Sequence, residues 1–216
     1  MTDFDIAEAD RLLKTTKQVR KRMDLTRPVP RELLLECIEV AGHAPTGGNI
    51  QANRWLVVDD DELKAQIAPY YQQVGYPYLE EQMAGIADPT QQRVADSARY
   101  LLDHIAEVPA MVIATRLGVP GAHNFEAASF HGSVAPAVWI FQIAARVRGL
   151  GSAWTTFHLA HEREVGELLG IPDTVTQVAL LPVGFYTGAG FRPAARRDAT
   201  SITYFNGWRR RLDQVS

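Results

Sequence analysis

The apolar positions of this chain follow two periods, and segments of the two kinds alternate along the sequence. Apolar residues spaced three and four apart predict amphipathic helices at residues 4–15, 31–41, 61–68, 93–105 and 162–169. Continuous apolar runs predict interior strands at residues 55–58, 109–115 and 176–185, and residues 151–157 are expected to form a strand or an extended turn. Because helices and strands are interleaved, the pattern predicts an α+β or α/β class with helices packed around one sheet.

The longest apolar segment predicts a helix over residues 126–148, which is apolar nearly all round from Val134 to Val147. A helix with this pattern is buried on several faces. One domain of this size rarely surrounds a helix completely, so a helix shared across a dimer interface is the natural explanation. The glycines of residues 149–151 are expected to end the helix, because glycine accepts the left-handed cap conformation.

Two segments have no clear period. Residues 69–92 are rich in Tyr, Gln, Gly and Pro and are expected to form an irregular, mobile, lid-like segment. Residues 186–216 are expected to form a C-terminal arm with a short β-like stretch at 200–205. No internal repeat or linker is visible, so a single domain over residues 1–216 is expected. The sequence leaves open whether the tyrosines of the first segment cover a ligand or form a packed aromatic patch; they are Tyr70, Tyr71, Tyr76 and Tyr78.

Composition narrows the class of protein. The chain has 216 residues, of which 46% are hydrophobic and 22% charged, and this balance is typical of a globular protein with a full core. The best candidate for a spanning helix is shorter than about 20 residues and contains Gln142 and Arg146, so no membrane insertion is expected. The acidic N-terminal segment shows no apolar stretch of a secretory signal. Cys37 is the sole cysteine, which excludes an intrachain disulfide. We therefore expect a cytoplasmic protein in which Cys37 is a small buried residue on the 31–41 helix.

Charge bears on the choice of partner. The net charge of −3 argues against nucleic acid, because nucleic-acid binding needs a strongly basic surface. Basic residues nevertheless cluster at 14–31, 192–197 and 209–211. Such small clusters fit a small ligand that carries phosphate, although solvated surface arginines explain the last of them equally well.

Several common catalytic motifs are missing from the sequence. No G-x-G-x-x-G opens a helix after a strand, and there is no G-x-x-x-x-G-K-[ST]. Ser133 is not in a G-x-S-x-G turn. His158 and His161 are three residues apart, but no third ligand joins them in a known metal pattern, so no metal site is expected. These gaps favour chemistry carried by a bound cofactor, with the protein supplying orientation and electrostatics.

Three segments resemble the FMN-dependent nitroreductase family. Residues 17–24 (KQVRKRMD) with 28–30 (PVP) resemble its opening, and residues 44–51 (APTGGNIQ) resemble its A-P-[ST]-x-x-N-x-Q loop. Its C-terminal half is matched by residues 149–156 (GLGSAWTT), 170–172 (GIP) and 181–184 (LPVG), and 191–196 (FRPAAR) resemble an actinobacterial-type branch. The resemblance implies an α+β three-layer sandwich, with a mixed or antiparallel central sheet flanked by helices. It also implies an intertwined homodimer with two FMN sites, each built from both subunits.

The resemblance also implies a reaction. NADPH or NADH would reduce FMN in a ping-pong cycle, and a nitroaromatic or quinone acceptor would take the electrons through flavin N5. Three departures from the family pattern, at Lys17, Gln18 and residues 52–53, motivate an alternative, a flavin-binding or storage module with little turnover. A second alternative is a related flavin chemistry, such as reductive dehalogenation or flavin cleavage.

By position in the motifs, Lys17, Gln18 and Arg20 are expected to face the FMN phosphate and ribityl chain, and Arg196 to close the phosphate from the C-terminal arm. Fixed cations and N–H donors suit a phosphate. The alternative is a solvated basic stretch, which we prefer for Lys21 and Arg22.

A second group of site residues is expected to come from the partner subunit and to lie against the flavin ring and ribityl chain. The residues are Pro45, Thr46, Gly47 and Asn49. Glycine lets a backbone approach a ligand closely, and an Asn side chain both donates and accepts hydrogen bonds. An ordinary turn after a helix explains the same residues equally well.

A third group, Thr155, Thr156, His158 and Leu159, is expected along the isoalloxazine edge. The backbone N–H groups of His158 and Leu159 would point at flavin N5 and O4, where a donor stabilises developing negative charge. No side chain is needed as a nucleophile or base, because hydride transfer depends on stacking and distance. The alternative for His158 is a surface histidine before a helix.

Overall fold

The computed structural model describes residues 3–212, which divide into two compact parts. The larger part spans residues 16–189, and the smaller part combines residues 3–15 with 190–212. The C-terminal arm thus begins near Gly190 rather than at residue 186, because Tyr186 still pairs with Met23 and the Thr187 N–H donates to the Arg22 carbonyl.

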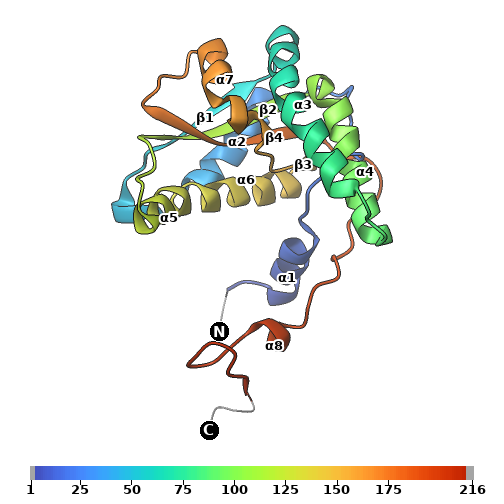
Figure 1. Ribbon diagram of the computed structural model, residues 1–216, viewed down its shortest axis with the longest axis vertical. Coiled ribbons are helices and arrows are strands. Elements are labelled where there is room, and N and C mark those ends of the chain that lie inside the picture. Colours follow the sequence, from blue (N-terminus) through green and yellow to red (C-terminus); the bar gives the residue numbers. More distant parts are fainter. Residues whose placement is uncertain (1–2, 213–216) are drawn as a thin grey trace. The chain divides into compact units, whose positions relative to one another are not determined.

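The larger part is built on a four-stranded antiparallel sheet (Figure 1). Its strands are β1 (Asn53–Val58), β2 (Ala110–Leu117), β3 (Leu150–Ser152) and β4 (Val175–Phe185), in the order β1-β2-β4-β3. In the register, Val112 of β2 lies opposite Val57 on one side and Leu181 on the other. The continuous apolar runs that predicted β2 and β4 are thus explained by strands at the centre of the sheet.

Two hydrophobic cores cover the two faces of the sheet. Along β2, Val112 and Ala114 point into the first core, which includes α2 (Arg31–Gly42) and α6 (Ala135–Val147). The intervening residues Met111 and Ile113 point into the second core, with α3 (Asp61–Met83), α4 (Pro89–Asp103) and α7 (Glu162–Leu169). This alternation has the period of two that a strand buried on both faces requires. The predicted α+β class with helices on both sides of one sheet is confirmed.

The N-terminal segment of the larger part runs beside β3, which is an edge strand. The Val19 N–H donates to the Ser152 carbonyl at 2.9 Å. The Val19 side chain packs directly on Gly151, where an added Cβ would lie 2.6 Å from Val19 Cγ1. A glycine is therefore required at this position of β3 by the close approach of residue 19.

The predicted helix over residues 126–148 is wrong as a single element. The structure has α5 (Asn124–Gly132) and α6, with a break at Ser133 and Val134. The Ser133 hydroxyl donates back to the Ser129 carbonyl at 2.9 Å, and Pro136 lies in the first turn of α6. Serine back-bonding and a proline without an N–H both favour ending one helix and starting another here.

The expectation of an irregular segment over residues 69–92 is also wrong. Helix α3 extends to Met83 with Pro69 and Pro77 inside it, and α4 begins at Pro89 after the N-cap Asp88. Tertiary packing overrides the low helix propensity of this segment: Tyr71 is buried in the second core, and Gly75 allows the Leu102 side chain to approach. Figure 1 shows α3 and α4 as a helical pair. A lid function for this pair stays a prediction.

The smaller part contains α1 (Ile6–Thr15) and α8 (Ala199–Ile202). The β-like stretch expected at 200–205 is wrong, because Asp198 caps a short helix by accepting from the Thr200 N–H. The other short helices are η1 (Gly47–Asn49), η2 (Ile105–Glu107) and η3 (Phe157–His161). Among the described residues, no helix combines the length and the apolar character that crossing a membrane requires.

Candidate cofactor-binding site

A cavity of about 620 Å³ lies between the α3–α4 helical pair and the segment that follows β3. Three residues expected at the cofactor, Arg20, Thr155 and Thr156, line this cavity. They come from segments about 135 positions apart, so the fold alone brings them together. The other lining residues are Tyr71, Tyr78, Leu79, Gln82, Ile86, Thr90, Gln91, Val94, Ala95, Ala98, Trp154 and Phe157.

Arg20 is the single charged side chain among the residues that line this cavity. Burial lowers the pKa of its guanidinium, and the nearby Tyr71 opposes that shift. Within residues 3–212, no carboxylate forms an ion pair with Arg20. A half-buried cation that faces a cavity without a counter-ion suits an anionic ligand group such as a phosphate.

Thr155 is held rigidly behind the cavity wall. Its N–H and its hydroxyl both donate to the Leu180 carbonyl of β4, at 3.0 and 2.7 Å. Burial raises the pKa of the adjacent Tyr71 to about 12, although a hydrogen bond with the Thr155 side chain and the charge of Arg20 lower it. Tyr71 is therefore a neutral phenol at physiological pH, able to donate one hydrogen bond.

Lys17 and Gln18 do not line the cavity. Lys17 is exposed, whereas Gln18 is half-buried and its side-chain oxygen accepts a hydrogen bond from the Trp154 N–H. Gln142 of α6 donates to the same oxygen at 3.3 Å. The Gln18 side-chain oxygen therefore already accepts two hydrogen bonds from groups of the protein itself.

His158 and Leu159 lie in η3, just beyond the cavity wall. The His158 side chain is 0% exposed, so its interpretation as a surface histidine is wrong. Neither of its ring nitrogens has a hydrogen-bond partner among residues 3–212, and burial lowers the pKa of the imidazole to about 4. The Leu159 N–H already donates to the Thr156 carbonyl at 3.0 Å, so the predicted contact of this N–H with flavin O4 would have to share that bond.

The loop with Pro45, Thr46, Gly47 and Asn49 does not line the cavity. The Gly47 N–H donates to the Ser133 hydroxyl at 3.1 Å, which attaches the loop to the end of α5. Pro45, Gly47 and Asn49 are exposed, and Asn49 has a left-handed backbone with φ of 55°. The role of this loop at a partner's flavin therefore stays a prediction, as does the alternative of an ordinary turn.

Arg196 belongs to the smaller part of the structure and is exposed. Its guanidinium donates to the Ala195 carbonyl at 2.9 Å. Its predicted contact with the cofactor phosphate stays a prediction. Cys37, in contrast, is fully buried on α2, and burial raises the pKa of its thiol to about 11, so its interpretation as a buried small residue is confirmed.

None of the lining residues from α3 and α4 was predicted from the sequence as part of the site. Those between residues 71 and 91 fall in the segment expected to be irregular, whereas Val94, Ala95 and Ala98 fall in the helix predicted over residues 93–105. A usable signal existed, because Asp88 followed by Pro89 is a typical helix start. From that start, Thr90, Val94 and Ala98 recur every four residues and share one face of α4.

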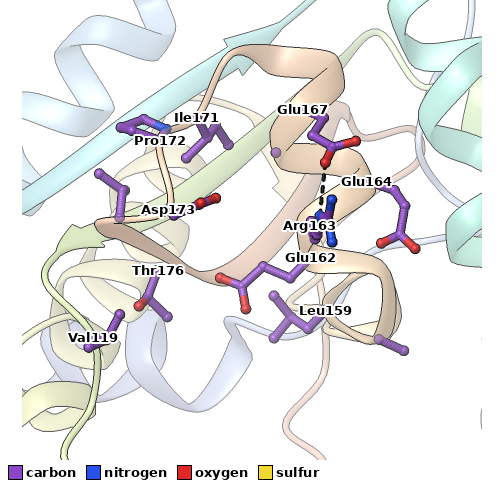
Figure 2. Close-up of a pocket in the computed structure, with 13 residues that line it drawn as sticks. Val119, Leu159, Glu162, Arg163, Glu164, Glu167, Ile171, Pro172, Asp173 and Thr176 are labelled. Carbon is purple, nitrogen blue, oxygen red and sulfur yellow. Dashed lines mark hydrogen bonds and ion pairs between the residues drawn. The ribbon is translucent and has the colours of Figure 1, made fainter.

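A second cavity of about 550 Å³ lies beside α7 and the beginning of β4 (Figure 2). Glu162, Glu164, Glu167 and Asp173 line it, and Arg163 forms an ion pair with Glu167 at 2.8 Å. Of the residues expected at the flavin, Leu159 alone lines this second cavity, whereas Thr155 and Thr156 line the first. Its acidic lining is unsuited to a phosphate.

Comparison with known proteins identifies the family of the chain. A model of the nitroreductase family matches residues 19–185. An iodotyrosine deiodinase from Thermotoga neapolitana is 28% identical over 177 residues, which are 81% of this chain and 86% of that protein.

Solved structures share the fold. An iodotyrosine deiodinase bound to FMN and 3-iodo-L-tyrosine has a TM-score of 0.68 at 24% identity, with 91% of this chain and 98% of that chain covered. A BluB-like flavoprotein from Clostridium difficile 630 has a TM-score of 0.67 at 19% identity, with 94% and 100% covered. A nitroreductase-like family protein from Bacillus cereus has a TM-score of 0.67 at 18% identity, with 96% and 100% covered. This chain belongs to the nitroreductase family.

Proposed function

We propose that this protein is an FMN-dependent oxidoreductase that uses NADPH or NADH to reduce nitroaromatic or quinone-type acceptors. The observation that carries the proposal is the meeting of Arg20 with Thr155 and Thr156 at one cavity of about 620 Å³ in a nitroreductase-family domain. When bound, FMN supplies the redox chemistry, because its ring accepts a hydride from the nicotinamide and passes the electrons on to the acceptor.

The residues of the chain have binding and orienting roles in this proposal. Arg20 neutralises the phosphate group, since it is the charged residue of the cavity lining and has no carboxylate partner within residues 3–212. Thr155 and Thr156 form part of the wall, and Thr155 fixes it to β4, so that the ring is held at a defined distance. The His158 N–H stabilises negative charge at the ring edge. Lys17, Gly47 and Asn49 are proposed to contact the cofactor as their motif positions imply, the last two from a partner subunit in a homodimer.

The acceptor is proposed to be neutral and aromatic. Among the residues that line the cavity, α3 and α4 contribute aromatic, aliphatic, amide and hydroxyl side chains, such as Tyr78, Gln82 and Gln91, and no carboxylate or ammonium group. A nitroaromatic or a quinone needs stacking and hydrogen bonds, which these side chains offer. An amino acid carries one positive and one negative charge, and burying both without partners is costly.

Reductive dehalogenation is the second candidate, favoured by the 28% identity to an iodotyrosine deiodinase. We retain two further functions as proposals of lower rank, a flavin-binding or storage module and flavin cleavage. Membership of the actinobacterial-type branch and a cytoplasmic location are also proposals. The neutral lining from α3 and α4 argues for nitro or quinone reduction over an amino-acid substrate.

Steady-state kinetics on the purified full chain tests the proposal. We expect a yellow protein that oxidises NADPH or NADH with a quinone such as menadione, or with a nitrofuran, and that leaves 3-iodo-L-tyrosine largely unreacted. Rapid deiodination would favour the second candidate. Tight flavin binding with no turnover of any acceptor would favour the storage module, and a colourless protein that does not bind added FMN would contradict all three.

A further inference from the structure

The N–H groups of residues 153–155 point alternately to the two sides of the extended segment that follows β3. The Ala153 N–H donates to the Pro182 carbonyl and the Thr155 N–H to the Leu180 carbonyl, both in β4. The Trp154 N–H points the other way, toward the open edge of the sheet, where no further strand follows β3. A half-buried N–H at such an edge needs an acceptor.

The Gln18 side chain supplies that acceptor. Its Oε1 accepts the Trp154 N–H, and the same oxygen accepts a hydrogen bond from Gln142 Nε2 at 3.3 Å. Gln142 is 3% exposed, and its Nε2 also donates to Ser152 Oγ at 3.1 Å. The N-terminal segment, α6 and the end of β3 are thus joined through one oxygen atom.

The geometry of residues 18–20 explains why this bond bears on the cavity. Val19 faces Gly151 and donates its N–H to the Ser152 carbonyl, so the segment runs alongside β3. Gln18 thus holds the backbone of Trp154, while Arg20, two residues further along, lines the cavity together with the same Trp154.

We propose that Gln18 is a positioning residue, which fixes the cavity wall formed by residues 154–157 through its side-chain oxygen and makes no contact with the cofactor phosphate. Its position in the nitroreductase motif implies a phosphate contact, and this proposal replaces that role. The positioning of Trp154 by Gln18 does not depend on the proposed function. The expected effect of Gln18 on flavin binding rests on the proposed function.

Two variants separate the two roles, because Gln18→Glu keeps an acceptor oxygen and Gln18→Leu does not. The first measurement is hydrogen exchange of the Trp154 amide by NMR on the flavin-free protein. We expect exchange about tenfold faster in Gln18→Leu, from the loss of one partly buried hydrogen bond, and exchange close to that of the parent in Gln18→Glu. Lys21→Gln, at an exposed neighbouring position, is the matched control and should change neither this nor the next measurement.

The second measurement is the ratio of FMN affinity to riboflavin affinity. A positioning role predicts that Gln18→Leu weakens both ligands by the same factor, because a displaced wall affects the shared ring. A phosphate contact predicts that Gln18→Leu weakens FMN alone. An unchanged Trp154 exchange rate in Gln18→Leu, or a ratio that falls tenfold, would overturn the proposal.

A third variant covers the case in which Gln18→Leu does not fold. Gln142→Leu removes the side-chain donor that orients the Gln18 oxygen, and we expect Trp154 exchange to rise while the affinity ratio stays unchanged. The proposal would be overturned by two results together: a Trp154 amide that exchanges at the parent rate in Gln142→Leu, and a folded Gln18→Glu protein in which the Trp154 amide is not protected from exchange. If the parent protein binds no flavin, the exchange results still decide the positioning role, and the proposed function alone fails.

Discussion

The cavity wall of residues 154–157, with His158 just beyond it, and the loop of residues 45–49 are both expected at a flavin, yet the chain holds them in opposite ways. Hydrogen bonds join the wall to β4, and the Gln18 side chain accepts the Trp154 N–H. The next residue, His158, is fully buried. The loop is mostly exposed, and its link to another element of the chain is the bond from Gly47 to Ser133. The wall is thus shaped by the packing of a single chain, whereas the binding role proposed for the loop requires a second copy of the chain.

The largest expected effect is on the buried imidazole of His158, just beyond the wall. The folded-state pKa of His158 is about 4, below the ordinary value of 6.5. The stability that neutral burial contributes is therefore full above pH 6.5 and is lost as the pH falls from 6.5 through 4. The loss approaches about 3 kcal/mol, because each pKa unit corresponds to about 1.4 kcal/mol.

Urea unfolding at pH 7, 5 and 4 measures this loss. His158→Leu removes the titrating group, so the part of the pH dependence due to His158 should disappear in that variant, while carboxylates elsewhere act equally in both proteins. Identical pH dependence of the two free energies of unfolding would show that His158 does not stay neutral in the folded state.

The next effect is on cofactor affinity at the cavity. Arg20→Ala should weaken FMN binding roughly tenfold to a hundredfold, because a charge-assisted hydrogen bond to an ionised group is worth about 1.5–3 kcal/mol. Lys21→Ala, at an exposed position outside the cavity, should leave the affinity unchanged. Fluorescence titration with FMN measures both. Equal losses in the two variants would indicate a diffuse electrostatic contribution rather than a contact.

The contact between Gly151 and the Val19 side chain gives an effect of similar or smaller size. In Gly151→Ala the new Cβ would lie 2.6 Å from Val19 Cγ1, so that either backbone or side chain must shift. Overpacking of this kind costs about 1–3 kcal/mol. Gly132→Ala is the matched control near the loop, since its Cβ meets nothing within 4 Å. Denaturant midpoints should fall for Gly151→Ala and stay level or rise for Gly132→Ala.

The smallest effect on stability is expected at the loop. Ser133→Ala removes the acceptor of the Gly47 N–H, and the loss should stay at or below about 1 kcal/mol, because water reaches this exposed glycine. If a partner subunit's flavin needs the loop in place, FMN affinity should nevertheless fall, by roughly threefold to tenfold. FMN titration at several protein concentrations checks this. A loss that does not depend on protein concentration would place the loop at the flavin of its own chain.

The sequence was sufficient where one local pattern determined the structure. The apolar runs of β2 and β4 predicted strands correctly, because a strand covered on both faces is a nearly continuous apolar run. The start of α3 was predicted over residues 61–68, but its continuation to Met83 was not, because Pro69, Pro77 and Gly75 contradict helix propensity and packing against α4 overrides them.

In the candidate site, too, some residues were predicted from local motifs, whereas the roles of others depend on contacts between distant parts of the chain. Arg20 and Thr155 were found through a family resemblance of their motifs and do line one cavity. The role of Gln18 depends on what lies across from it, namely the Trp154 N–H and Gln142, and no pattern within residues 17–24 contains that information. The burial of His158 likewise depends on long-range packing.

The position of residues 19–24 beside β3 and the end of β4 has a consequence for solubility. An uncovered edge strand offers its N–H and carbonyl groups to other chains and is a starting point for aggregation. Here the Val19 N–H occupies the Ser152 carbonyl, and the Asp24 N–H occupies the Phe185 carbonyl at 2.7 Å. The segment that carries Arg20 therefore also shields an apolar sheet from self-association, and substitutions that loosen it should lower expression yield as well as flavin content.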